Sequence, residues 1–80
     1  MSKSEIRVPA EIPDDEIVLV TAIHVPSKSS VKSGDAIFEI ETSKTSYVIS
    51  SDHSGILEHD LKLGDELNSG QLLGTVENDI

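Results

Sequence analysis

The middle of this 80-residue chain reads Ala36-Ile-Phe-Glu-Ile-Glu-Thr-Ser-Lys-Thr-Ser-Tyr-Val-Ile-Ser-Ser51. On its first limb Ala36, Phe38 and Ile40 fall on one face, and the glutamates that alternate with them fall on the other. That two-residue period is typical of a half-buried strand. The second limb, 47–49, is aromatic or β-branched, which also suits a strand. The sequence therefore predicts two short strands joined by a tight turn.

The predicted turn is Thr42-Ser43-Lys44-Thr45, which holds no apolar residue, no glycine and no asparagine. A turn that requires positive φ is therefore disfavoured, and the prediction is a type I turn, which accepts most residues at its centre. Such a turn would hold Lys44 in water at the tip of a stiff hairpin. A single exposed lysine is usually only a solubilising charge, so its meaning depends on its surroundings.

Composition limits the function classes that this chain can serve. It has no cysteine, and 15 acidic against 6 basic residues give a net charge of −9. A surface of this sign repels phosphate, which argues against nucleic acid and against an anionic membrane. There is no apolar run of the ~20 residues that a membrane span needs, and no secretory signal. We expect one soluble, cytoplasmic domain spanning residues 1–80.

The rest of the chain consists of short apolar runs separated by turn residues. Residues 1–4 are expected to be loose, and 5–8 to form a short edge strand that Pro9 ends. Residues 16–25 are rich in β-branched side chains and favour a strand over a helix. Further runs restart at 56–57 and end with 71–76. Strand-sized pieces at this spacing predict a small all-β sandwich or barrel.

The chain also repeats itself. A shift of 36 positions pairs Val25 with Leu61, Val31 with Leu67, Gly34 with Gly70, Ile37 with Leu73, Ile40 with Val76, and Glu41 with Glu77. Two copies are too few for a solenoid. They predict two similar half-sheets packed about a pseudo-two-fold axis, with Lys44 just past the first copy, at a crossing between the halves. The matching place in the second copy is Asp79-Ile80, at the chain end.

These motifs resemble a lipoyl domain of the biotinyl/lipoyl-attachment family. The residues that carry the resemblance are Glu41-Thr-Ser-Lys-Thr45, the preceding Val31-Lys-Ser-Gly-Asp-Ala-Ile-Phe-Glu-Ile40, the following Ser54-Gly-Ile-Leu57, and Gly64-Asp65 with Gly70. The family's motif is Glu-Thr-Asp-Lys-Ala at a hairpin tip. The resemblance covers about residues 5–77. It implies an all-β flattened barrel of two four-stranded antiparallel sheets with quasi-two-fold symmetry.

The resemblance also implies a function. A lipoate ligase or lipoyl transferase would join lipoic acid to Lys44 through an amide, and Glu41, Thr42, Ser43 and Thr45 would form the flanking recognition motif. The carrier would then shuttle acyl groups or reducing equivalents between the dehydrogenase and acyltransferase components of a 2-oxoacid-dehydrogenase-type complex. The reactive sulfurs would belong to the cofactor. The domain itself would be a carrier and not an enzyme, standing alone or within a larger acyltransferase.

Two alternatives accompany this interpretation. The first is a biotin carrier domain of a carboxylase, but that family flanks its lysine with methionines, where this chain has Ser43 and Thr45. The second is an unmodified barrel used for docking or assembly. The departures of this chain from the lipoyl motif support this alternative: Ser43 replaces Asp, Thr45 replaces Ala, and the segment 26–29 lacks a Gly-Asp turn.

No other constellation of residues indicates chemistry. The three histidines, His24, His53 and His59, come without cysteine and without regular ligand spacing, so we predict no metal site. The many serines lie in turn-rich segments and form no argued nucleophile–base set. We therefore predict no catalytic residue.

Overall fold

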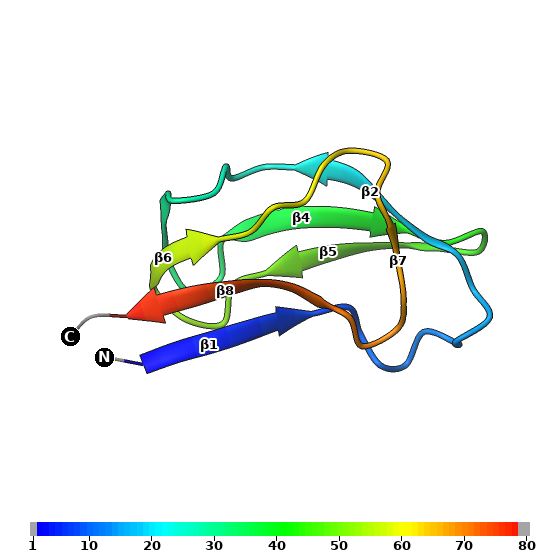
Figure 1. Cartoon of the computed structure of the whole chain (residues 1–80), viewed down its shortest axis with the longest axis horizontal. Coiled ribbons are helices and arrows are strands. Elements are labelled where there is room, and N and C mark those ends of the chain that lie inside the picture. Colours follow the sequence, from blue (N-terminus) through cyan, green and yellow to red (C-terminus); the bar gives the residue numbers. More distant parts are fainter. Residues whose placement is uncertain (1, 79–80) are drawn as a thin grey trace.

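The computed structural model describes residues 2–78, which form only strands and their connections (Figure 1). The strands are β1 (Ser2–Arg7), β2 (Val18–Ile23), β3 (Ser30–Val31), β4 (Ala36–Glu41), β5 (Ser46–Ser50), β6 (Gly55–Glu58), β7 (Glu66–Leu67) and β8 (Leu72–Asn78). They make two four-stranded antiparallel sheets, with strand orders β1-β8-β6-β3 and β5-β4-β2-β7. The predicted all-β fold is confirmed.

The two sheets are related by the predicted quasi-two-fold symmetry. Exchanging β1 with β5, β8 with β4, β6 with β2, and β3 with β7 converts one strand order into the other. The predicted half-sheets need correction, because each copy of the repeat gives two strands to one sheet and its short middle strand to the other. Lys44 accordingly lies in a hairpin of one sheet instead of at a crossing between halves. The position predicted to match it, Asp79-Ile80, lies outside the described residues.

The core lies between the sheets. Its buried side chains are Ile6, Val8, Ile12, Val18, Val20, Val31, Ile37, Phe38, Ile40, Ile49, Leu57, Leu67, Leu73 and Val76. Phe38 is fully buried, and the ring of His59 meets it edge-on with centroids 4.9 Å apart. Burial of each large apolar side chain stabilises the fold by roughly 1.5–3 kcal/mol. These contacts fix the base of the β4–β5 hairpin.

The alternation predicted for 36–41 fails at one position. Ala36 is exposed and Ile37 is buried next to Phe38, because a β-bulge lies between Ala36 and Phe38 in the pairing of β4 with β5. A bulge inserts one extra residue, so two consecutive side chains can face the core. From Phe38 onward the predicted alternation holds, with Glu39 half-buried and Glu41 exposed on the outer side.

At the N-terminus the predicted edge strand is confirmed, but its start was wrong. Residues 2–4, expected to be loose, belong to β1, which pairs along its length with β8 from Ser2↔Asn78 onward. Beyond the strand Val8 is buried, and its N–H donates to the carbonyl of Gln71 at 2.9 Å. Backbone pairing with β8 therefore makes this segment a strand, although its polar side chains give no sign of one.

Lys28 and Gly64 adopt the same left-handed conformation at equivalent places in the repeat, with φ of 75° and 86°. Each N–H bonds the facing strand: Lys28 donates to Leu57 O at 2.6 Å, and Gly64 to Val20 O at 2.8 Å. The segment 26–29 thus forms a turn equivalent to that at 62–65 without the Gly-Asp pair. The amine of Lys28 also meets the carboxylate of Glu58 at 2.6 Å.

The molecule is elongated, with principal extents of 39 × 20 × 19 Å. The tip of the β4–β5 hairpin lies at one end of the long axis, and the start of β1 and the end of β8 lie at the other (Figure 1). The tip is therefore remote from the described ends of the chain.

Candidate functional site

The hairpin tip, 42–45, is organised by the hydroxyl of Thr42. This side chain is only 7% exposed. Its Oγ1 accepts hydrogen bonds from the N–H groups of Lys44 and Thr45, both at 3.2 Å, and donates to Thr45 O at 3.3 Å. The Thr42 N–H also donates to Thr45 O at 2.8 Å. This one hydroxyl therefore satisfies two tip amides that the strand ladder leaves open.

The tip needs no left-handed residue. Among the described residues, Lys28 is the one non-glycine with positive φ, so the turn at 42–45 has none. The prediction on this point is confirmed. It follows that the polar turn residues hold the lysine without backbone strain.

Lys44 is exposed, and the hydrogen bonds and ion pairs found within residues 2–78 do not engage its amine. Only its backbone N–H is bonded, to Thr42. A primary amine held this way is accessible to an enzyme that acylates it, and the flexible stem can move while its base stays fixed.

A groove runs beside the tip. Ser43 Oγ donates to the carboxylate of Glu16 at 3.2 Å, which connects the tip to the 8–17 segment between β1 and β2. The groove has a volume of about 370 Å³ and is lined by Asp15, Glu16, Ile17, Leu19, Glu41, Thr42 and Ser43. Sequence reasoning missed it, because Ile17 was expected within a strand. The strand begins at Val18 instead and leaves Ile17 64% exposed.

The predicted motif residues therefore take different places. Thr42 is buried and holds the turn, Ser43 contacts Glu16, and Thr45 bonds its neighbour Thr42. Glu41 ends β4 on the outer face, opposite Leu19 of β2, and lines the groove. The structure brings all four together with Lys44 at the same end of the molecule.

Acidic side chains predominate at this end. The 8–17 segment contains Glu11, Asp14, Asp15 and Glu16 and no basic residue, and Glu41 lies across the groove from it. Lys44 is the one basic residue of the tip. A surface of this kind attracts basic partners and accelerates their encounter more than it adds affinity.

The histidines lie elsewhere; the side chains of His24 and His59 make pairwise contacts, and His53 lines the cavity beside β1 and β5. His24 Nε2 lies 2.6 Å from the Glu39 carboxylate, and His59 accepts from the Leu61 N–H through Nδ1 at 3.1 Å. Across the part of the chain that is described, no three His, Cys, Asp or Glu side chains gather where they would hold a metal ion. Nor do residues 2–78 include a helix of the length and hydrophobicity that a membrane span requires.

A comparison with protein families connects this geometry to a known class. The family of biotin/lipoyl attachment domains, described as "Biotin-requiring enzyme", matches residues 4–76. No curated protein matches the chain. The matched segment includes most of both sheets and the whole Lys44 hairpin. Domains of this family bind lipoic acid or biotin covalently and act as carriers instead of catalysts. With nearly its whole length matched, the chain belongs to the biotin/lipoyl attachment domain family.

Proposed function

We propose that this domain is a lipoyl carrier loaded on Lys44. It would shuttle acyl groups or reducing equivalents between active sites of a 2-oxoacid-dehydrogenase-type multienzyme complex. The observation that carries the proposal is the placement of Lys44 at the tip of a rigid hairpin in a fold of this family, where the lysine is exposed and its amine has no ion-pair partner among residues 2–78.

A carrier lysine has two requirements that this tip meets. It must be open to a ligase and to several client enzymes, and its base must not move, so that the arm alone supplies the reach. Tip exposure provides the first, and the hydroxyl of Thr42 with the buried Phe38 and Ile40 provides the second. When bound, lipoic acid supplies the dithiolane sulfurs, which a chain without cysteine does not have.

Condensation of the lipoate carboxylate with the Lys44 ammonium group would form the amide and release one water overall, which removes one positive charge from the chain. The formal net charge would change from −9 to −10 (−9 − 1). The loaded tip would then carry no lysine charge beside the acidic 8–17 segment. We expect the ligase and the client enzymes to present basic surfaces to this end.

The neighbours of Lys44 favour lipoic acid over biotin. Ser43 and Thr45 flank the lysine, and the chain's one methionine is Met1, far from the tip in sequence. The methionines that flank the lysine in biotin carriers are therefore missing. Ser43 additionally contacts Glu16, so a ligase that reads the tip would meet the 8–17 segment at the same time.

The test is the intact mass of the chain co-expressed with a lipoate ligase and supplied with lipoic acid, followed by peptide mapping. We expect one lipoyl amide on Lys44, lost in Lys44→Arg and kept in Lys62→Arg, which changes another exposed turn lysine. Loading that survives Lys44→Arg would refute the site. A biotin adduct with a biotin ligase would make the domain a biotin carrier. No adduct from either class of ligase would favour a docking module.

A further inference from the structure

The four strands at the sheet edges differ in how they are protected. The edges are β1 and β3 in one sheet and β5 and β7 in the other. An unprotected edge presents free backbone groups that pair with another chain, and proteins avoid this with short or charged edge strands. β3 and β7 have two residues each and offer too little backbone to pair.

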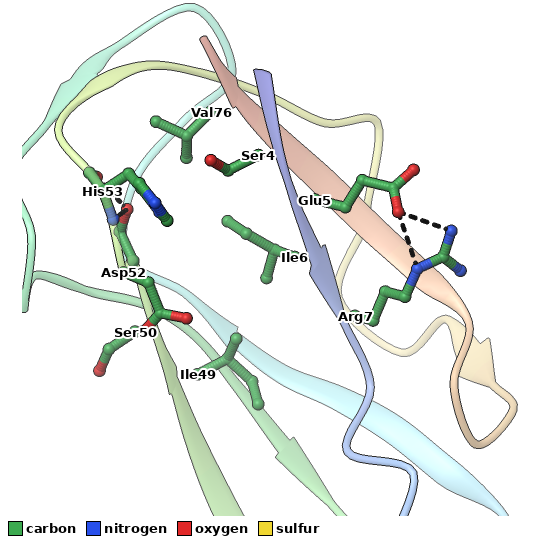
Figure 2. A pocket seen from close by; sticks show the side chains of 10 residues that line it. Ser4, Glu5, Ile6, Arg7, Ile49, Ser50, Asp52, His53 and Val76 are labelled. Carbon is green, nitrogen blue, oxygen red and sulfur yellow. Dashed lines mark hydrogen bonds and ion pairs between the residues drawn. The ribbon is translucent and has the colours of Figure 1, made fainter. Parts of the chain in front are cut away.

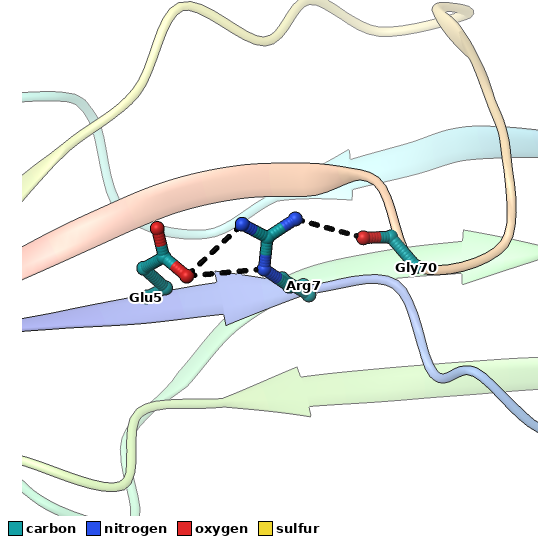
Figure 3. Close-up of polar contacts among 3 residues, drawn as sticks. All are labelled: Glu5, Arg7 and Gly70. Atoms are coloured by element: carbon teal, nitrogen blue, oxygen red, sulfur yellow. Dashed lines mark hydrogen bonds and ion pairs between the residues drawn. The ribbon is translucent and has the colours of Figure 1, made fainter.

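β1 is protected by charge. Three of its residues are Lys3, Glu5 and Arg7. The guanidinium of Arg7 bonds the carboxylate of Glu5 at 3.0 and 3.1 Å and the carbonyl of Gly70 at 3.0 Å, so it reaches from β1 toward the turn before β8 (Figure 3). A strand added at this edge would lie beside three exposed charged side chains.

β5 has neither form of protection. Its sequence, Ser46-Tyr-Val-Ile-Ser50, contains no charge and no proline, and β4 is its one strand neighbour within residues 2–78. β1 does not close over it: a cavity of about 140 Å³ separates the two strands, with Ile6 and Ile49 beside the gap (Figure 2). Val48, at the centre of the strand, is 60% exposed.

The direction of the free backbone groups follows from the hairpin. Thr42 N–H bonds Thr45 O, and Ser51 N–H bonds Asp35 O. Hydrogen-bonded and non-bonded pairs alternate along an antiparallel ladder. The backbone N–H and C=O groups of residues 47 and 49 therefore point toward β4. Residues 46, 48 and 50 therefore direct their N–H and C=O groups away from the sheet.

We propose that two copies of this chain pair antiparallel through β5, about a two-fold axis at Val48. The strand is nearly palindromic, so each residue meets a compatible one: Val48 meets its own copy, Ser46 meets Ser50, and Tyr47 meets Ile49. The three outward residues would form about six bonds between the copies, which makes one continuous sheet of both β5-containing sheets.

The same register also determines which charged residues face each other across the interface. Lys44 and Asp52 lie at equal sequence distances from Val48 on either side, and both are exposed. The lysine of one copy therefore faces the aspartate of the other, twice per dimer, which offsets part of the repulsion between two chains of net charge −9. Acylation of Lys44 would remove both pairs, so the loaded domain would dissociate more readily. The dimer forms from the unmodified chain, so this proposal does not rest on the carrier function.

The first test is sedimentation velocity of the unmodified chain over micromolar to millimolar concentrations. We expect a concentration-dependent dimer. Val48→Lys places a charge at the edge, and Val48→Pro removes an outward N–H that the ladder with β4 does not use. Each should weaken the dimer by about tenfold or more. Circular dichroism will verify that both variants are folded.

The matched control is Ile56→Lys, which makes the same charge change at an exposed apolar residue of β6, an inner strand of the other sheet. It should leave the association constant unchanged. A chain that stays monomeric at millimolar concentration, or a dimer that Ile56→Lys weakens as much as Val48→Lys does, would overturn the proposal.

The register has its own test. Lys44→Asp and Asp52→Lys should each weaken the dimer, and the double variant should restore it because the two charges are exchanged. A double variant no tighter than the weaker single variant would exclude the antiparallel register about Val48.

Discussion

The backbone N–H of Lys44 donates a hydrogen bond of 3.2 Å to the side-chain hydroxyl of Thr42. The lysine is exposed, whereas the threonine is buried at the end of the hairpin. This contact transmits the rigidity of the barrel to the residue that we propose is modified. The conformation of the tip therefore depends on the hydroxyl oxygen of one buried threonine.

Thr42→Val should loosen the tip without unfolding the domain. The change keeps the shape of the side chain but leaves the amides of Lys44 and Thr45 without their acceptor. We expect the free energy of unfolding to fall by about 1–2 kcal/mol. Hydrogen exchange of these two amides should accelerate, and the rate of ligase modification should fall.

Two variants separate the role of the hydroxyl from that of the position. Thr42→Ser keeps the oxygen and should retain slow amide exchange. Thr45→Val removes a hydroxyl that reaches only the carbonyl of Ser46, at 3.4 Å. It should leave the free energy of unfolding and the exchange of the two tip amides nearly unchanged. Equal effects of Thr42→Val and Thr45→Val would contradict the assignment.

The left-handed turns predict opposite effects of two substitutions. Gly64→Ala should lower the free energy of unfolding by about 1–2 kcal/mol, since a Cβ is disfavoured at a φ of 86°. Lys28→Gly should raise it, because glycine relieves the same conformation while the lost contact with Glu58 is exposed to solvent. Urea unfolding measures both, and a destabilised Lys28→Gly would show that the Glu58 contact outweighs the backbone term.

Gly55→Ala should be destabilising for a different reason. A Cβ at this position would lie 2.3 Å from the carbonyl oxygen of Glu77 and 2.7 Å from its carbon, so β6 and β8 would have to move apart. We expect the free energy of unfolding to fall by about 1–3 kcal/mol, as it does when other well-packed cores are overpacked. Ser30→Ala, on the adjacent strand β3, adds no atom and serves as the control. Comparable urea midpoints for the two variants would argue against the close approach.

The contact between Lys28 and Glu58 makes a small part of the stability pH-dependent. The hydrogen bond from Lys28, and then its charge, lower the pKa of Glu58 below its ordinary 4.5. The same hydrogen bond raises the pKa of Lys28 above 10.5. The contribution of this contact to the free energy of unfolding is therefore complete between the two ordinary pKa values, 4.5 and 10.5. It is lost as the pH falls through the lowered pKa of Glu58 or rises through the raised pKa of Lys28.

The measurement compares Glu58→Gln with the parent chain by urea unfolding at several pH values. The difference in midpoint should be small but present at neutral pH and should vanish in acid. Glu66→Gln, at an exposed glutamate outside the three ion pairs of the described residues, is the control. A Glu58→Gln difference that grows on acidification would reverse the expected sign.

Local signals made much of the fold predictable. The alternation around Phe38 and Ile40 located the hairpin, and Gly34 and Gly70 marked equivalent turns, which have φ of 94° and 76°. Because these residues recur at one spacing, the symmetry could be inferred before any contact was known. The exposure of Lys44 followed from the polarity of its turn.

Features that depend on distant partners were not predictable. β1 begins at Ser2 because β8 continues to Asn78, and polar side chains give no sign of that pairing. The bulge beside Phe38 and the left-handed Lys28 are likewise imposed by facing strands. Thr42 is an ordinary turn residue in sequence, and only the packed hairpin shows that its hydroxyl is buried.

Ser2 and Asn78 are cross-strand partners at the end of the long axis opposite the tip (Figure 1). A segment that joined the domain to a neighbour through either end would act as a pivot, and the barrel, 39 Å long, would be a rigid lever with Lys44 at its free end. Rotation about that pivot would move the lysine along an arc whose radius is set by the long dimension of the barrel. The length of the barrel would then determine which surfaces the tip can visit.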